Sequence, residues 1–201
     1  MRSACVFLVA LVFTASTNTF ANPSLVGYTV LGGGGIDEVA TGMKSTYIAT
    51  DRGDEIKLST SISLISSFDK LTLLVCARPC ASYKPSLLVL VKGKAHAAQL
   101  LVAGSGSSYG NPLSELDGYT VVLESEVSSV RSDRYGGKVV KLADGKALRI
   151  SMLLLDPLFG TDVVVFARTF EVTDKKTGAP TTFTMFKLMF DGDDEVYDIT
   201  P

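Results

Sequence analysis

The sequence predicts an all-β protein, an antiparallel β-sandwich of the jelly-roll or immunoglobulin-like type with little helix. Three observations predict this fold. Apolar and polar side chains alternate over residues 55–65, which is the period of a strand with one buried face. Asp144-Gly145 separates two apolar-rich runs and accepts the positive φ angles of a tight hairpin turn. Turn residues also recur along the chain at the spacing of short strands.

The remaining elements follow from short apolar runs bounded by turn residues. The expected strands are residues 24–31, 70–76, 86–92, 99–103, 119–124, 138–142, 147–154, 162–172, 181–190 and 195–199. Residues 36–44 and 113–116 are the best helical candidates, and both are short. The polar residues 174–180 predict a longer loop between two strands, and Asp191-Gly192 predicts a turn before the last strand.

The N-terminus predicts export from the cytoplasm. Arg2 supplies a positive charge, residues 6–12 form a short apolar run, and residues 19–21 resemble a signal-peptidase cleavage site. We therefore expect residues 1–21 to be a signal peptide, and the mature protein to begin at Asn22 and be secreted or periplasmic. No second long apolar stretch follows, so we expect no integral membrane span after the signal is removed.

Residues 22–201 are expected to form a single β-sandwich domain. A Gly-, Ser-, Asn- and Pro-rich stretch at residues 104–118 allows a division into two parts there. Each half would be a marginal sandwich, which favours one domain with a long crossover.

Composition excludes one class of partner. The chain has 201 residues, a formal net charge of -2 and no Trp. A nucleic-acid-binding protein usually presents a basic patch, and Lys and Arg are scattered here, so we expect no nucleic-acid partner.

Two cysteines remain after removal of the signal peptide. Cys76 and Cys80 have three residues between them, which is not the spacing of a redox motif, and no second Cys or His pair completes a zinc site. Because two cysteines in an oxidising compartment usually pair, we expect a structural disulfide between them.

Several motifs are candidates for chemistry. The segment from Asp191 to Glu195 concentrates carboxylates that suit Ca²⁺, but it lacks EF-hand spacing, so we interpret it as a solvated acidic turn and expect no cofactor. Its candidate ligands are Asp191, Asp193, Asp194 and Glu195. Residues 52–54 spell Arg-Gly-Asp, and residues 32–35 are four glycines that resemble the start of a phosphate-binding loop. We interpret the first as an ordinary turn and the second as a flexible hinge.

No credible catalytic set accompanies these motifs. Ser108 lies in a G-x-S-x-G match, but Asn-Pro follows it where a helix is needed, and the only histidine, His96, lies upstream. We therefore expect a non-catalytic binding or structural module that acts through loops or edge strands on a protein or small-ligand partner. One alternative is a secreted hydrolase that uses His96 with Ser108, or a carboxylate pair such as Glu124 and Glu126. A second alternative is a small outer-membrane β-barrel, against which the lack of Trp argues.

Overall fold

The computed structural model describes residues 24–63, 65–76, 84–104, 115–150, 160–175, 178–193 and 195–200, and these form twelve strands. The first six are β1 (Tyr28–Thr41), β2 (Thr46–Thr50), β3 (Glu55–Leu58), β4 (Lys70–Cys76), β5 (Leu87–Val91) and β6 (Lys94–Val102). The last six are β7 (Thr120–Ser132), β8 (Lys138–Leu142), β9 (Ala147–Ile150), β10 (Asp162–Thr173), β11 (Pro180–Phe190) and β12 (Tyr197–Thr200).

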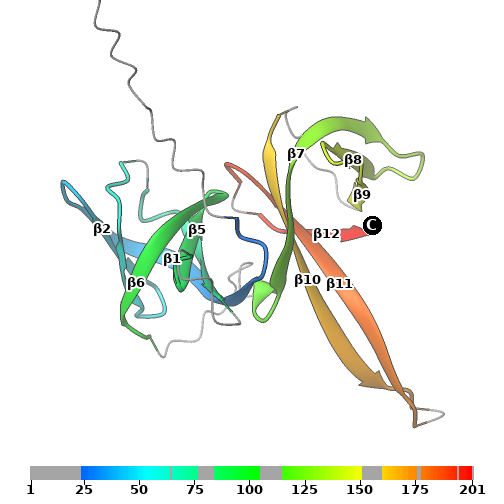
Figure 1. Ribbon diagram of the computed structural model, residues 1–201, viewed down its shortest axis with the longest axis horizontal. Helices are drawn as coiled ribbons and strands as arrows, with labels where there is room; N and C mark the ends of the chain where they lie inside the picture. The colour runs from blue at the N-terminus through cyan, green and yellow to red at the C-terminus, as the bar shows by residue number, and fades with distance from the viewer. Residues whose placement is uncertain are drawn as a thin grey trace, which may run out of the picture.

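The strands close into two six-stranded barrels that lie side by side (Figure 1). In the first barrel the order is β1-β2-β3-β6-β5-β4, and the pairing of β1 with β4 closes the ring. In the second the order is β7-β8-β9-β12-β11-β10, and the pairing of β10 with β7 closes it. Every pairing is antiparallel, so the all-β, antiparallel prediction is confirmed. The sandwich type is not confirmed, because closure pairs the strands that would otherwise be the edges of open layers.

The two barrels repeat one topology down to their irregularities. The first strand of each barrel carries one extra residue opposite its fourth strand, Leu31 in β1 and Val122 in β7. Each first strand carries a second extra residue opposite the second strand of its barrel. This residue is Asp37 in β1, opposite β2, and Ser128 in β7, opposite β8. Because a bulge increases the local bend of a strand, the same two bulges give both first strands the bend that closure requires.

The turn after the second strand is repeated as well. In the first barrel Gly53 N donates to Thr50 O and Thr50 N donates to Asp54 O. In the second barrel Gly145 N donates to Leu142 O and Leu142 N donates to Lys146 O. This confirms the hairpin expected at Asp144-Gly145, where Gly145 has a φ of 89°. Each residue of one barrel can therefore be matched to a residue of the other by its place in the pairing.

Three apolar clusters form the core. One fills the first barrel and includes Ile48 and Leu71, and a second fills the other barrel and includes Val140 and Leu188. The third lies between the barrels and joins the outer faces of β1, β4 and β5 to those of β7, β10 and β11. Its largest fully buried side chains are Tyr28 and Phe166. The interface thus uses the same three strands from each repeat.

Some local expectations were wrong. The helical candidate at residues 36–44 is mostly the second half of β1, a paired strand in which Ile36 and Val39 face the barrel interior. The alternating stretch at residues 55–65 is a strand only as far as Leu58. The four glycines at residues 32–35 are not a hinge but part of β1. Of the other helical candidate, residues 113 and 114 lie outside the described residues. Nowhere in the described ranges does the chain form a helix long and apolar enough to cross a membrane.

Candidate functional site

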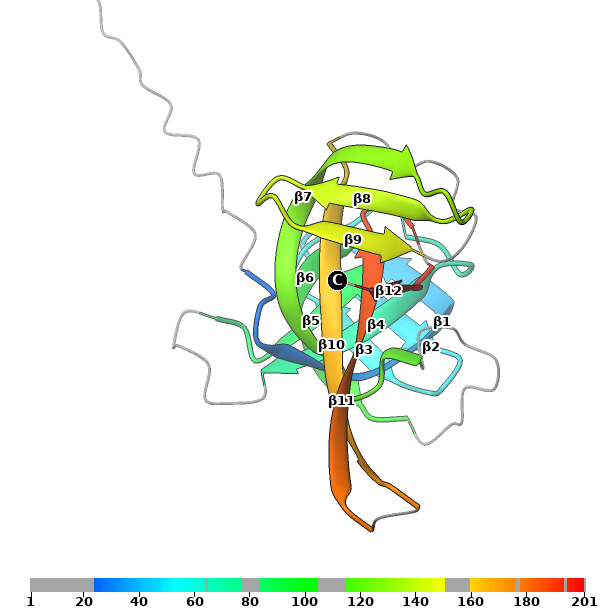
Figure 2. The same cartoon turned by 90° about the vertical axis from the view of Figure 1, so that its right-hand side faces the viewer.

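The second barrel carries a projecting hairpin that has no counterpart among the described residues of the first barrel. In the first barrel, β4 and β5 pair from Leu71↔Val91 to Val75↔Leu87. The matching part of the second barrel runs from Val163↔Phe190 to Ala167↔Phe186, but β10 and β11 continue to Thr173↔Pro180. We call residues 168–173 and 180–185 the arm. Figures 1 and 2 both show the arm extending beyond the rest of the molecule.

One face of the arm is apolar and exposed. Because side chains alternate along a strand, Phe170 and Val172 of β10 lie on the same face as Phe183 and Met185 of β11. The rings of Phe170 and Phe183 stack at 5.3 Å with an interplanar angle of 16°. Val172, Phe183 and Met185 keep 48%, 46% and 39% of their surface exposed. This face continues the interbarrel cluster, since Phe166 and Met189 lie on the same face nearer the body.

The opposite face of the arm is polar. It carries Thr169, Glu171, Thr182 and Thr184, and the hydroxyl groups of Thr169 and Thr184 lie 3.0 Å apart in a hydrogen bond. The arm is therefore a two-stranded amphipathic ribbon. Its apolar face contacts the body at the base, where the Phe170 ring meets the Tyr119 ring edge-on at 6.4 Å, and is exposed further out at Val172 and Phe183. Such ribbons are marginal in water unless an apolar face is packed against something.

The arm also presents free strand edges. The pairing of β7 with β10 ends at Thr120↔Ala167, and the pairing of β12 with β11 ends at Ile199↔Phe186. Within the described residues, the two strands of the arm pair only with each other. Their outer backbone N–H and C=O groups are therefore available to an added strand.

The base of the arm is fixed by charged side chains. The Arg168 guanidinium lies over the Phe170 ring at 4.8 Å and donates to the Asp117 carbonyl oxygen. Lys187 is only 6% exposed, and its ammonium donates to Glu115 at 3.0 Å and to Asp198 at 2.9 Å. Burial lowers the pKa of Lys187, but these two carboxylates outweigh burial and hold the pKa above its usual value. The ammonium therefore stays charged.

The carboxylate pair proposed from the sequence lies between the barrels. Glu124 and Glu126 line a cavity of about 550 Å³, together with Asp191 from the turn after β11. Glu124 is engaged structurally, because its carboxylate accepts hydrogen bonds from Ser24 Oγ at 2.8 Å and Leu25 N at 2.7 Å. These contacts tie the start of the described chain to β7.

His96 lies apart from these carboxylates, in the wall of the first barrel. It pairs with Val89 across β5 and β6, and Val89 faces the barrel core, so the imidazole faces inward. Burial, with a smaller contribution from the Lys94 charge, lowers its pKa. His96 occupies the place that Tyr197 holds in the second barrel. Ser108 lies outside the described residues, so its pairing with His96 stays untested.

The acidic turn is held by its own hydrogen bonds. Asp193 accepts hydrogen bonds from Glu195 N at 3.0 Å and from the Tyr197 hydroxyl at 2.7 Å. Burial first, and then the Asp193 and Glu195 carboxylates, raise the pKa of Tyr197. Asp194 lies outside the described residues. Within the described ranges, no group of three or more His, Cys, Asp or Glu side chains is arranged to hold a metal ion.

The Arg-Gly-Asp sequence is packed into the fold. Asp54 is 8% exposed and accepts hydrogen bonds from Gly104 N at 2.8 Å and from Thr50 Oγ1 at 3.3 Å. Arg52 donates to the Gly33 carbonyl oxygen at 3.2 Å. The glycines of β1 leave room for this side chain, since a Cβ on Gly32 would lie 2.7 Å from Arg52 Nη1. The segment therefore stabilises the turn and is not presented for recognition.

Only one cysteine of the predicted disulfide lies among the described residues. Cys76 is the last residue of β4, at the edge of the interbarrel cluster. Cys80 lies outside the described residues, so the bond stays a prediction.

Sequence reasoning placed strands over residues 162–172 and 181–190 but missed the arm. Its signal was the length of the two runs, each longer than the matching strands of the first barrel. No family model, curated protein or solved structure matches the chain.

Proposed function

We propose that this chain is an exported, non-catalytic binding module that recognises a protein partner with its arm. The observation that carries the proposal is the six-pair extension of β10 and β11 beyond the barrel, with an apolar face left exposed. Exposed apolar surface is a liability that folded monomers usually limit, so a surface of this kind indicates a partner that covers it.

The arm suits an extended segment of another protein. Free strand edges supply backbone hydrogen bonds, and alternate apolar side chains of the added segment would pack beside Phe170 and Phe183. Backbone pairing gives affinity and the aromatic pair gives selectivity for alternating apolar residues. A closed barrel without the arm would offer neither edge.

Export is part of the same proposal. A partner outside the cytoplasm requires the signal peptide expected at residues 1–21. N-terminal sequencing of native material should give Asn22 as the first residue, and recovery of Met1 from secreted protein would contradict export by this route.

The test uses arm variants that keep strand propensity. Phe183→Thr and Met185→Thr remove apolar contact from one face, whereas Thr182→Ser alters only the opposite face. After a partner is isolated with the intact mature chain, its affinity should be measured with purified components by calorimetry. Loss of a buried Phe contact is worth about 1.5–3 kcal/mol, so binding should weaken by roughly tenfold to a hundredfold in F183T.

Hydrogen exchange supplies a second readout. Amides at the outer edges of residues 168–173 or 180–185 should become protected in the complex, whereas the barrel amides should not change. Unaltered affinity in both Phe183→Thr and Met185→Thr, or amide protection confined to the barrels, would show that the arm is not the binding surface. Hydrolytic activity that His96→Ala abolished in a folded protein would favour the hydrolase alternative instead.

A further inference from the structure

The two barrels present matching outer faces with opposite charge. The acidic face comprises the outward side chains of residues 38–40, 47–49 and 55–57 in β1, β2 and β3, and the basic face comprises those of residues 129–131, 139–141 and 147–149 in β7, β8 and β9. Each face contains a hollow, of about 220 Å³ in the acidic face and about 280 Å³ in the basic face. The lining residues match by register, since Glu38, Ala49 and Glu55 correspond to Ser129, Lys141 and Ala147.

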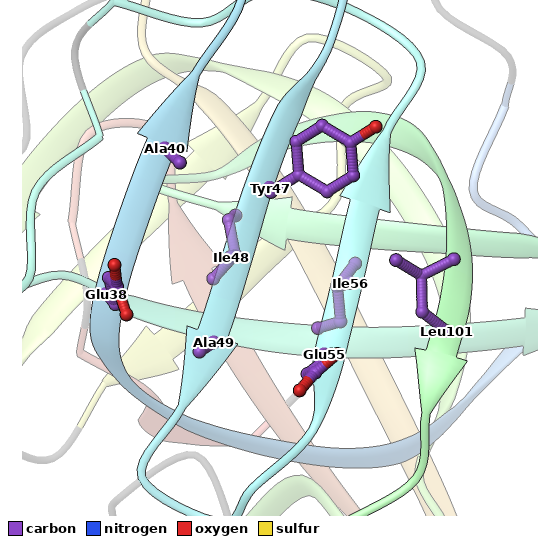
Figure 3. Close-up of a pocket in the computed structure, with 8 residues that line it drawn as sticks. All are labelled: Glu38, Ala40, Tyr47, Ile48, Ala49, Glu55, Ile56 and Leu101. Carbon is purple, nitrogen blue, oxygen red and sulfur yellow. The ribbon is translucent and has the colours of Figure 1, made fainter.

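The acidic face places two carboxylates on either side of a small residue. Glu38 pairs with Ala49, and Ala49 pairs with Glu55, so the three side chains form one row across the sheet. Tyr47 forms the wall of the hollow in the next row, and Leu101 borders it from β6 (Figure 3). This row lines a shallow, negatively charged hollow that can accommodate one long cationic side chain.

The basic face has the reverse pattern in the same row. Lys141 stands in the centre, between Ser129 and Ala147. Arg131 lies in the adjacent row beside Val139, where the acidic face has Ala40 beside Tyr47. A long cation thus occupies on one face the position that Ala49 leaves open on the other.

The charges involved are not neutralised within the described chain. Glu38, Glu55, Arg131 and Lys141 make no ion pair among the described residues, and all four are exposed. Arg149, by contrast, pairs with Asp133 on its own barrel. The acidic face also carries Lys57, whose ammonium lies over the Tyr47 ring at 5.4 Å, so its two carboxylates and one ammonium leave a net charge of −1. The basic face keeps two unpaired cations, so the charges of the two faces are opposite in sign.

We infer that the acidic face binds the basic face of a second copy of this chain, with Lys141 of one copy between Glu38 and Glu55 of the next. Because the two faces differ, the contact is heterologous and links copies head to tail. The two faces are separate from the arm, so this inference does not depend on whether the arm binds a partner.

Sedimentation velocity of the mature wild-type chain tests the inference. At low salt and about 0.1–1 mM, a range in which small interfaces associate, the chain should form species larger than a monomer. Raising the ionic strength to about 0.5 M should weaken association, because the Debye length falls to a few ångströms.

Charge reversal makes the test specific. Variant A carries Glu38→Lys and Glu55→Lys, and variant B carries Arg131→Glu and Lys141→Glu. Each variant alone has two faces of like charge and should remain monomeric, with association at least tenfold weaker. A one-to-one mixture should associate again, because each face then meets a face of opposite charge. Asp162→Lys, which reverses an exposed charge of β10 outside both faces and outside the arm, is the control and should associate like the wild type.

Every result of these measurements either supports or contradicts the head-to-tail contact. A monomeric wild type, association that persists in A or B alone, or a mixture that stays monomeric would overturn the inference. Circular dichroism and the melting temperature verify that the variants fold. If a reversal unfolds the chain, Glu38→Gln with Glu55→Gln replaces variant A and should still weaken association.

Discussion

Gly93, in the turn between β5 and β6, is one of the places where the first barrel touches the backbone of the second. It has a φ of 74°, and a Cβ added there would overlap Asp191 Cα and lie 3.0 Å from Asp191 Oδ1. The same approach allows Gly192 N to donate to Lys92 O at 2.9 Å. Gly93→Ala should therefore separate the barrels locally as well as strain the turn.

Gly192 is the matched control that the repeat provides. It occupies the same position in the turn between β11 and β12, has a φ of 83°, and a Cβ there would have no neighbour within 4 Å. Gly192→Ala thus adds only the left-handed backbone cost of about 1–2 kcal/mol. The reduced freedom of the unfolded chain offsets about 0.4–1 kcal/mol of it.

The expected difference between the two variants follows from the contact alone. Gly93→Ala has the same backbone terms, plus about 1–3 kcal/mol of overpacking and about 0.5–1.5 kcal/mol for the lost hydrogen bond. We therefore expect it to lower the free energy of unfolding by about 2–4 kcal/mol more than Gly192→Ala. With a urea slope of about 2 kcal/mol/M, its midpoint should fall roughly 1–2 M further.

Urea unfolding of the mature chain, followed by circular dichroism, measures both variants under one condition. The slopes must agree with the wild type for the midpoints to be compared. If the two variants lost stability equally, to within about 0.5 kcal/mol, the docking of the β5–β6 turn against Asp191 would be wrong.

Three further predictions concern single side chains. The pKa of His96 is lower in the folded protein than in the unfolded chain, so its contribution to stability is complete above about pH 6.5 and is lost as the pH falls below that value. In urea titrations, the free energy of unfolding of His96→Gln should therefore change less between pH 7 and pH 5 than that of the wild type. An unchanged pH dependence would contradict the burial of the imidazole. Lys187 occupies the position that Leu88 holds in the first barrel, so an apolar side chain of similar length should be tolerated there. Lys187→Met should lower the free energy of unfolding by less than about 1 kcal/mol and Lys187→Ala by about 2–3 kcal/mol, as measured by thermal unfolding. Equal losses of stability in the two variants would argue against packing of the lysine stem. Non-reduced mature protein should have a mass two hydrogens below the dithiol form if Cys76 and Cys80 are bonded, and free thiols in freshly secreted protein would exclude the bond.

The sequence by itself determined most of the strands and the hairpin at Asp144-Gly145, although it did not predict β2. Alternation of apolar and polar residues has a physical cause in the pleat of a strand, and the Asp144-Gly145 turn has one in the positive φ of Gly145, so both could be identified locally. The helical prediction at residues 36–44 was wrong because a bulge at Asp37 shifts the alternation and imitates a helical spacing.

Only the tertiary structure decided how the strands close and which surfaces remain open. Backbone pairing is nearly independent of side-chain identity, so two halves with little similarity in sequence adopt one register, bulge for bulge. Three features depend on residues far apart in the chain. They are the burial of Asp54, the exposure of Phe183, and the placement of the oppositely charged Glu38 and Lys141 on matching faces of the two barrels. Contacts of that range leave no periodic signal in the sequence, and they appear only once both barrels have closed.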